Sequence, residues 1–150
     1  MCCGRLSSPA TLPFSILKPN FVAEAYYYMG REYQYFGNYG EALRAYQTVI
    51  SLKPDSAAAH NNLGCALLQE GRLDEAIPHL QRALEIQPNM AEGHDNLGSA
   101  LVQKGQLDEA ISHYQKALAI DPDFSVHMGL GCALLYNGQL DEAITHCQKA

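Results

Sequence analysis

"AHNNLGCALLQEGRLDEAIPHLQRALEIQP" occupies residues 59–88, and "GHDNLGSALVQKGQLDEAISHYQKALAIDP" follows it at residues 93–122. Aligning residues 57–90 with residues 91–124 gives 20 identities in 34 positions. The same frame extends back over residues 23–56 and forward over residues 125–150, so the period is 34 residues. Self-similarity at a fixed period of this length is typical of stacked repeats, each of which is one supersecondary unit. The repeat therefore decides the fold.

Each repeat has the sequence pattern of two amphipathic helices. In residues 57–90, apolar residues recur every three or four positions in two runs that Gly71 separates. Because glycine readily adopts a positive φ, Gly71 is expected to close the first helix. Asp74 is predicted to cap the second helix at its N-terminus and Pro88 to end it. The equivalent residues in the other repeats are Gly37, Gly105 and Gly138; Asp108 and Asp141; Pro54 and Pro122.

Small residues occupy fixed positions in both predicted helices. They are Gly64, Gly98 and Gly131 in the first helix and Ala76, Ala110 and Ala143 in the second. Such residues let two helices approach closely, and a larger side chain is expected to overpack the contact at a cost of about 1–3 kcal/mol. One helix pair cannot bury its own apolar face, so successive pairs must stack. The sequence therefore predicts an all-α protein of stacked antiparallel helix pairs.

These markers resemble the tetratricopeptide repeat (TPR). The resemblance rests on Tyr26, Met29-Gly30, Tyr33, Ala42, Tyr46 and Pro54 in the first repeat, on Leu63-Gly64, Ala76 and Pro88 in the second, and on Leu97-Gly98, Ala110, Tyr114 and Pro122 in the third. His60 and His94 replace the large aromatic residue of the first helix in the second and third repeats. The resemblance implies the family fold, a right-handed superhelical solenoid of about 3.8 repeats whose first helices line a concave groove.

The repeat frame divides the chain into five predicted segments. Residues 1–22 are an irregular N-terminal segment, and the repeats are 23–56, 57–90, 91–124 and an incomplete 125–150. Pro19 lies near the position that ends a repeat, but the spacing is one residue too long. Solenoids need a terminal cap with a polar outer face, and the sequence stops at residue 150 within a predicted second helix without one. Either the chain is a fragment or truncated product, or its uncapped C-terminal end meets another subunit, so self-association is one of two predictions.

The joint before the fourth repeat is one residue short. Six steps separate Pro88 from His94, but only five separate Pro122 from His127. Counting back from Leu130 places the deletion in the linker, at residues 123–124, and not inside the helix. A deletion inside the helix would rotate its apolar face by about 100°. The fourth repeat is therefore expected to stack like the others.

The composition limits the class of protein. Hydrophobic residues make up 47% and charged residues 17%, which is typical of a globular chain. The net charge of −6, with Lys and Arg scattered, argues against a nucleic-acid partner. No apolar stretch approaches the roughly 18–20 residues that span a bilayer. Five cysteines without C-x-x-C spacing fit reduced thiols in the cytoplasm, with Cys147 expected in the buried stripe of its helix.

The residue types that could carry chemistry recur with the repeat. His60, His94 and His127 share one position, and His79, His113 and His146 share another. Equivalent helices of stacked repeats lie at least about 8–10 Å apart, whereas zinc binds nitrogen at about 2 Å, so a structural role is favoured. Asp-Glu pairs recur at helix starts and favour capping. Without a phosphate loop, nucleophile elbow or His-Glu-x-x-His motif, we expect no enzyme, no catalytic residue, no metal and no cofactor.

The resemblance implies that the concave groove is the binding site. Its expected lining is Tyr27, Arg31, Gln34 and Tyr35 in the first repeat, Asn61, Asn62, Cys65 and Gln69 in the second, and Asp95, Asn96, Ser99 and Gln103 in the third. Asn62 and Asn96 share one position, and a carboxamide both donates and accepts hydrogen bonds. They could form a two-step asparagine ladder for a peptide backbone, like that of O-linked N-acetylglucosamine transferases. The alternative is that these asparagines are common polar filler.

Another family mode, the carboxylate clamp for chaperone C-terminal tails, fits this sequence poorly. That mode needs Lys and Asn in one repeat, Asn in the next, and Lys and Arg in the third. This chain offers Tyr27 and Arg31, then Asn62, then Glu92 and Asn96. The cations are missing, and one is replaced by an acid. A clamp on an acidic tail is therefore not expected.

Two functions remain for the sequence. The first is a non-catalytic scaffold that binds a partner peptide or helix in its concave groove through hydrogen bonds and tyrosine contacts. The second is the substrate-presenting TPR portion of a larger enzyme, such as a glycosyltransferase whose catalytic domain is not in this chain. The unfinished final helix motivates the second function.

Overall fold

The computed structural model describes residues 19–122 and 124–149. Within these ranges the chain forms eight α-helices and no strand. The helices are α1 (Pro19–Tyr35), α2 (Tyr39–Leu52), α3 (Ala57–Gln69), α4 (Leu73–Ile86), α5 (Ala91–Gln103), α6 (Leu107–Ile120), α7 (Phe124–Tyr136) and α8 (Leu140–Lys149). No helix in the described part of the chain combines the length and the apolar character that crossing a membrane requires.

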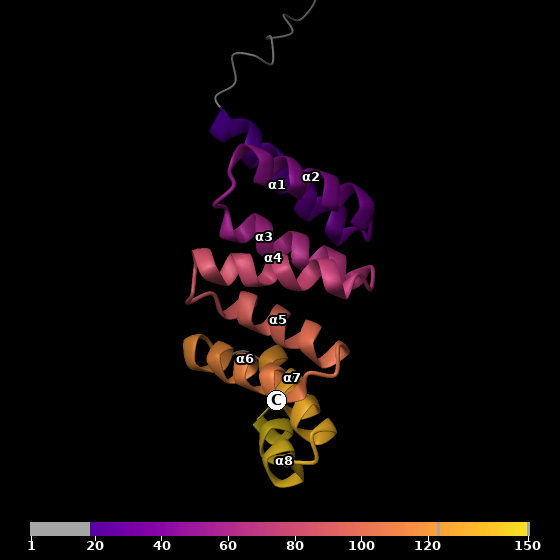
Figure 1. The fold of residues 1–150 in the computed structure, drawn as a ribbon, viewed down its shortest axis with the longest axis vertical. Coiled ribbons are helices and arrows are strands. Elements are labelled where there is room, and N and C mark those ends of the chain that lie inside the picture. The colour runs from indigo at the N-terminus through magenta and orange to yellow at the C-terminus, as the bar shows by residue number, and fades with distance from the viewer. Residues whose placement is uncertain (1–18, 123, 150) are drawn as a thin grey trace, which may run out of the picture.

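The helices form antiparallel pairs that stack along one axis, as Figure 1 shows. Each odd-numbered helix packs against the helix that follows it, and each even-numbered helix packs against the next pair. α1 also contacts α3, α3 contacts α5 and α5 contacts α7, whereas no two even-numbered helices contact each other among the described residues. The odd-numbered helices are therefore the inner layer of a right-handed superhelical solenoid, and the predicted fold class is confirmed.

The first helix of each pair ends in the same glycine turn. Gly37, Gly71, Gly105 and Gly138 have φ values of 74°, 73°, 79° and 80°. In the second pair, the N–H of Gly71 donates to the carbonyl of Leu68 and the N–H of Arg72 to that of Leu67, both at 2.9 Å. This is the Schellman arrangement, in which a left-handed residue satisfies the last carbonyls of the helix. The glycines therefore end the helices as predicted.

A second glycine brings the two helices of a pair together. A Cβ added to Gly64 would lie 2.6 Å from Cγ of Leu80, and one added to Gly98 would lie 2.9 Å from the ring of Tyr114. These distances leave no room for a methyl group. The core continues from one pair to the next as a cluster of buried alanine, leucine and tyrosine side chains that begins at Ala42 and ends at Ala143.

The first helix begins earlier than the sequence predicted. Residues 1–22 were expected to be irregular, but α1 starts at Pro19 and includes residues 19–22. Proline suits the first position of a helix, where its missing N–H has no partner in any case. Pro19 is therefore the first residue of a helix. Residues 1–18 lie outside the described residues.

The predicted aspartate caps are also wrong. α4 begins at Leu73 and its N-cap is Arg72, so Asp74 is the second residue of the helix; Asp108 in α6 and Asp141 in α8 are second residues too. The carboxylates still favour the positive end of the helix dipole. Asp74 accepts a bond from Nζ of Lys104 at 3.0 Å, and Asp108 accepts one from Nδ2 of Asn137 at 2.9 Å. These aspartates therefore join successive pairs.

The short joint before the fourth pair leaves the register intact. Two residues separate Pro88 from α5, but only residue 123 separates Pro122 from α7. α7 packs on α6, and His127 occupies the same place relative to His146 that His60 occupies relative to His79. The deletion therefore falls in the linker, as predicted, although Phe124 itself belongs to the helix.

Candidate peptide-binding groove

The groove predicted from the sequence lies on the inner layer of the solenoid. Its twelve residues come from α1, α3 and α5, the three successive helices that contact one another along the concave side. Arg31, Tyr35, Gln69 and Gln103 are exposed, while most of the others are half-buried.

A chain of hydrogen bonds crosses the groove floor from α1 to α5. Nδ2 of Asn62 donates to the hydroxyl of Tyr27 at 3.2 Å, and Nδ2 of Asn61 donates to Oδ1 of Asn62 at 3.4 Å. Nδ2 of Asn96 in turn donates to Oδ1 of Asn61 at 3.0 Å. Each bond between helices joins one repeat to the next. We call these four residues the amide chain.

The amide chain changes what the predicted asparagines can do. The side chain of Asn61 is 1% exposed, so it supports the groove floor and does not face a ligand. Asn62 and Asn96 are half-buried, and each gives one N–H to a neighbouring repeat. An amide has two N–H groups and two carbonyl lone pairs, so each retains capacity beyond that bond. The hydrogen bonds between repeats thus hold Asn62 and Asn96 in position and use only part of their hydrogen-bonding groups.

Two further polar contacts hold the floor of the groove. Nε2 of Gln34 donates to Sγ of Cys65 at 3.3 Å across the joint between the first two repeats, and the hydroxyl of Tyr46 donates to Oε1 of Gln34 at 2.9 Å. Burial, followed by the neighbouring Tyr27, raises the pKa of Tyr46 to about 12. Burial also raises the pKa of the Cys65 thiol, so the thiol stays protonated and inert.

The charge of the groove is mixed, and it becomes acidic toward the third repeat. Glu92 and Asp95 are the carboxylates that act electrostatically on Cys65. Arg31, exposed on α1, is the one cation among the twelve predicted groove residues. Ser99 and Tyr114 share a hydrogen bond at 3.0 Å between their hydroxyls, which adds an uncharged polar contact in the third repeat.

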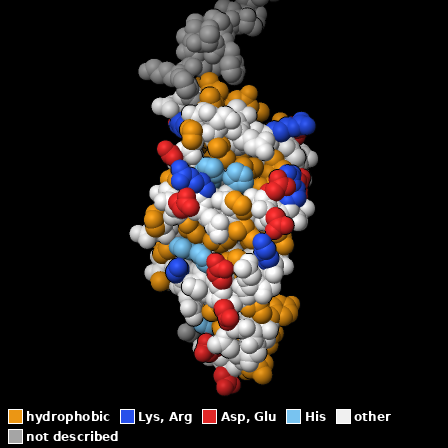
Figure 2. Space-filling model, viewed as in Figure 1, with side chains coloured by type: hydrophobic (Ala, Val, Ile, Leu, Met, Phe, Trp, Pro, Cys, Tyr) orange, Lys and Arg blue, Asp and Glu red, His pale blue; other side chains and the backbone are white. Residues whose placement is uncertain are grey.

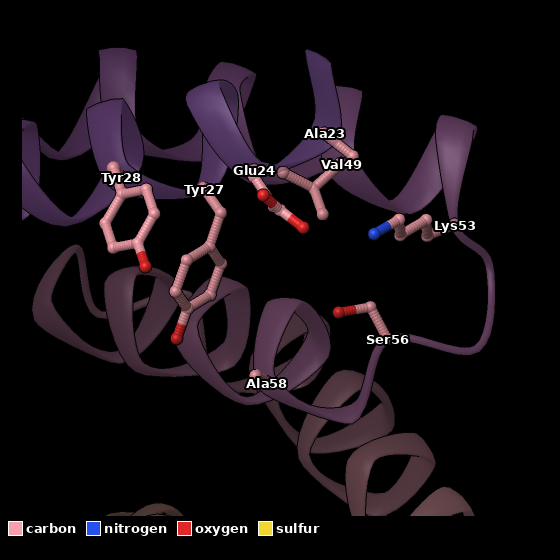
Figure 3. Close-up of a pocket in the computed structure, with 8 residues that line it drawn as sticks. All are labelled: Ala23, Glu24, Tyr27, Tyr28, Val49, Lys53, Ser56 and Ala58. Atoms are coloured by element: carbon pink, nitrogen blue, oxygen red, sulfur yellow. The ribbon is translucent and has the colours of Figure 1, made fainter. Parts of the chain in front are cut away.

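An apolar pocket of about 230 Å³ opens where α1, α2 and α3 meet. Its lining is Ala23, Glu24, Tyr27, Tyr28, Val49, Lys53, Ser56 and Ala58. Figure 3 shows the rings of Tyr27 and Tyr28 along one side and the charged ends of Glu24 and Lys53 pointing toward the space between the lining residues. The sequence predicted Tyr27 here but not the pocket, because its space depends on the small side chains at Ala23, Ser56 and Ala58.

The histidines form pairs that the sequence did not predict. The Nδ1 atoms lie 3.2 Å apart in His60–His79, 2.9 Å apart in His94–His113 and 3.2 Å apart in His127–His146. Each pair joins the two helices of one repeat, not two neighbouring repeats. The signal in the sequence was the constant separation of 19 residues. In the described part of the chain, no three His, Cys, Asp or Glu side chains are placed to hold a metal ion.

The cysteine prediction needs one correction. Cys147 was expected in the buried stripe of α8, but it is exposed. It takes the position of Leu80 and Tyr114, opposite Gly131. Cys65 is half-buried and Cys132 is exposed; all three are unpaired thiols.

Comparisons with known proteins agree with this architecture. Two sequence models of the tetratricopeptide repeat match residues 27–91 and 67–128. A search of curated proteins found no match to the sequence. Structures of 392 chains match the fold, so the fold alone does not identify a partner.

Three solved structures illustrate the range of the matches. MamA from Desulfovibrio magneticus is 28% identical, with 85% of this chain covering 72% of that one at a TM-score of 0.77. An O-GlcNAc transferase from Thermobaculum terrenum is 31% identical over 79% of this chain but only 23% of its own, with a TM-score of 0.76. The first TPR of RPAP3 bound to the HSP90 peptide SRMEEVD is 19% identical over 79% of this chain and 94% of that one, at a TM-score of 0.76, and shows the fold alone. With four stacked helix pairs, the repeated glycine contacts and both sequence matches, the chain belongs to the tetratricopeptide repeat family.

Proposed function

We propose that this chain is a non-catalytic scaffold that binds an extended peptide of a partner protein in the groove of α1, α3 and α5. The observation that carries the proposal is the amide chain, which holds Tyr27, Asn62 and Asn96 in a row across three repeats. Because these side chains are already fixed by inter-repeat bonds, ordering them on binding costs little entropy. Their remaining amide groups can bond a peptide backbone without reading its side chains.

The apolar pocket supplies the anchor for such a peptide. Binding energy in protein interfaces concentrates in a few bulky side chains that fill desolvated pockets. The pocket is lined mainly by carbon, and its volume of about 230 Å³ suits one aromatic or large aliphatic side chain. Glu24 and Lys53, which also line the pocket, can orient the adjacent peptide bonds. The expected ligand is therefore a segment with one bulky apolar residue at its anchoring position.

The charge of the groove favours a neutral or basic peptide. Glu92 and Asp95 lie on α5, in the third repeat, and act electrostatically on Cys65 of α3. An acidic segment such as the HSP90 peptide SRMEEVD, which the RPAP3 domain binds, would bring its glutamates toward these carboxylates. Like charges in close contact are unfavourable, so this chain is expected to select against such tails.

The proposal can be tested with peptides selected on the protein itself. A phage-displayed library of random linear peptides is selected against the whole chain, and the enriched peptides are then labelled and measured by fluorescence polarisation. Ala58→Leu fills the pocket, so it should weaken binding by about 10-fold or more, which corresponds to about 1.4 kcal/mol. Selected peptides should share one bulky apolar residue and few acidic residues.

Ala25→Leu is the matched control, because Ala25 is exposed on α1 and does not line the pocket. It should leave the affinity unchanged, and circular dichroism should show the same helix content for both variants. Equal affinities for the wild type and Ala58→Leu would show that the pocket is not the anchor. Failure to enrich any peptide would contradict the proposed function.

A second function is favoured by the O-GlcNAc transferase match at 31% identity. In this alternative the same groove presents a protein substrate to a catalytic domain on the same polypeptide. Sequencing the transcript beyond codon 150 separates the two proposals. A reading frame that continues into a glycosyltransferase domain would support the alternative, and a stop codon directly after Ala150 would reject it.

A further inference from the structure

Three histidine pairs repeat along the surface of the solenoid. Each joins the two helices of its repeat, at α3–α4, α5–α6 and α7–α8, and Figure 2 shows the imidazole side chains in clusters one above another. His60 and His94 are the buried members of their pairs, at 7% exposure each, and His79 and His113 are half-buried. The first repeat has no such pair, since Tyr26 and Ala45 occupy the two positions.

The backbone fixes the proton on the buried ring. Nε2 of His60 lies 3.0 Å from the carbonyl oxygen of Pro54, and Nε2 of His94 lies 3.0 Å from that of Pro88. A carbonyl oxygen only accepts, so each Nε2 carries a proton. A neutral imidazole has one N–H, which leaves Nδ1 of the buried ring as an acceptor. The proton between the two rings therefore belongs to Nδ1 of the partner, His79 or His113.

The geometry favours a shared proton over a shared metal ion. The ring centres are 5.4, 5.1 and 5.5 Å apart in the three pairs. For a given distance between the two Nδ1 atoms, the ring centres are farthest apart when the two atoms point straight at each other. The observed separations are close to that maximum, so the two Nδ1 atoms of each pair point at each other. A tetrahedral metal ion with Zn–N bonds of about 2.0–2.1 Å would hold the two nitrogens about 3.3–3.4 Å apart, but both nitrogens would then point at the ion and not at each other. The short spacing together with the head-on orientation instead matches an N–H···N hydrogen bond.

Counting protons shows how such a pair responds to acid. The neutral pair contains one Nδ1–H, which makes the bond. The first added proton goes to Nε2 of the outer ring, and it strengthens the bond because the donor becomes charged. The second proton has only Nδ1 of the buried ring to bind. Two N–H groups would then face each other at about 3 Å on two cations, and the contact has to open.

The charged groups around the histidine pairs do not remove the repulsion between two charged rings. Burial and then His60 lower the pKa of His79, and Glu75 opposes them. Burial lowers the pKa of His113 and of His94, and Lys116 lowers both further; Glu109 acts against the shift at His113, and the bond to Pro88 acts against it at His94. At the first pair, Arg82 of α4 bridges Asp55, in the loop after α2, and Glu85, both at 3.0 Å. The charged groups that shift the pKa values of His79, His94 and His113 belong to the same repeat as the histidine they act on.

We propose that each histidine pair is an acid-sensitive contact that holds the helices of its repeat together with zero or one proton and opens when both rings are charged. His60 and His94 also hold the proline linker that precedes their repeats, so opening releases the joint with the preceding repeat as well. Acidification would therefore loosen the second to fourth repeats and change the curvature of the groove, whatever the groove binds. The first repeat would not respond.

The direct test is nuclear magnetic resonance on the whole chain labelled with ¹⁵N-histidine. At pH 7.5 a coupling between the two Nδ1 atoms across the hydrogen bond should be visible in each pair. The two rings of a pair should then titrate in two steps separated by more than about one pH unit, as coupled sites do. The coupling should vanish at the second step. Absence of the coupling at pH 7.5, or its survival when all rings are charged, would overturn the proposal.

A variant gives an independent readout. The triple variant H79N, H113N and H146N keeps an amide N–H near the position of Nδ1 but cannot titrate. Its urea midpoint should fall less than half as far as that of the wild type between pH 7.5 and pH 4.5. A parallel fall in both proteins would overturn the proposal. If the variant does not fold, the coupling in the wild type still decides.

Discussion

The first joint of the solenoid, where α1 and α2 meet α3, differs from the two joints that follow it. At the first joint, Tyr27 and Gln34 bond to side chains of the second repeat and a pocket opens beside them. The second and third joints each carry a polar bond at the surface, Lys104 to Asp74 and Asn137 to Asp108. The equivalent positions of the first joint hold Gly40 and Glu70, which cannot make that bond.

The difference shows that substitutions at one joint can give it a distinct surface while the repeated helix pairs keep the same fold. Ser56 and Ala58 leave space at the first joint, whereas the equivalent positions of the second joint hold Met90 and Glu92. The first repeat also lacks the histidine pair. The pocket proposed to anchor a peptide therefore lies at the first joint, whereas the histidine pairs and the surface bonds between repeats lie in the second to fourth repeats.

The largest expected effect tests whether the first repeat differs from the others only at its joint with the next repeat, or also in the packing of its own two helices. Gly30 and Gly64 each sit where a Cβ would be 2.6 Å from a side chain of the paired helix, Tyr46 and Leu80 respectively. Either substitution to alanine should lower the free energy of unfolding by about 1–3 kcal/mol, measured by urea denaturation. Gly40→Ala is the control, since nothing lies within 4 Å of its added Cβ. A much smaller cost at Gly30 than at Gly64 would mean that the helix pairs differ too.

The next test compares the amide chain at the two joints. Asn61→Ala leaves the amide of Asn96 without its buried acceptor, which should cost about 1–3 kcal/mol in thermal or urea unfolding. Tyr27→Phe removes only an acceptor for the half-buried Asn62, which water can replace, so it should cost no more than about 0.5–1 kcal/mol. Equal costs would show that burial does not distinguish the two joints.

Acid should act on the later repeats and spare the first. The pKa values of His79, His94 and His113 are lowered, chiefly by burial, so the folded chain binds fewer protons than the unfolded chain. The stability that these histidines contribute to the folded chain is therefore fully present above the ordinary histidine pKa of about 6.5 and is lost as the pH falls through the lowered pKa values. Amide hydrogen exchange at pH 7.5 and 5 should show protection lost in α3 to α6 but kept in α1 and α2, after correction for the intrinsic rate. Uniform loss would contradict the comparison.

The smallest expected effect concerns the surface bond of the second joint. Asp74→Ala removes the contact with Lys104, but the side chain of Asp74 is 89% exposed. Exposed ion pairs contribute little, so the free energy of unfolding should fall by less than about 0.5 kcal/mol. Repeating the measurement in high salt should abolish the difference from the wild type. A loss above about 1 kcal/mol would show that the bond organises the joint.

Most of the fold could be predicted because it depends on local chemistry that repeats. Gly71 and its equivalents end helices through a backbone conformation that other residues rarely adopt. Gly64 and its equivalents mark the close approach of two helices. A period of 34 residues then requires that each pair stacks on the next in the same way. These features need no knowledge of distant side chains.

The candidate site was less predictable, because burial and pairing depend on three-dimensional packing. The sequence placed Asn61 on the groove surface, but its amide is buried by Asn62 and Asn96. It found both histidine positions but not their contact, which depends on the rotation of two helices about their axes. It predicted the N-cap of α4 at Asp74, two positions later than the observed cap at Arg72, since helix ends are uncertain by one or two residues.

The direction of the bonds between repeats has a consequence for gene duplication. In both surface bonds the donor, Lys104 or Asn137, belongs to the later repeat and the acceptor, Asp74 or Asp108, to the earlier one. The third repeat carries a donor toward one neighbour and an acceptor toward the other. A tandem copy of that repeat would therefore meet itself with Lys104 against Asp108, complementary at the new junction without any further mutation. Arrays built this way can lengthen by copying a unit, and can later differentiate one junction for binding.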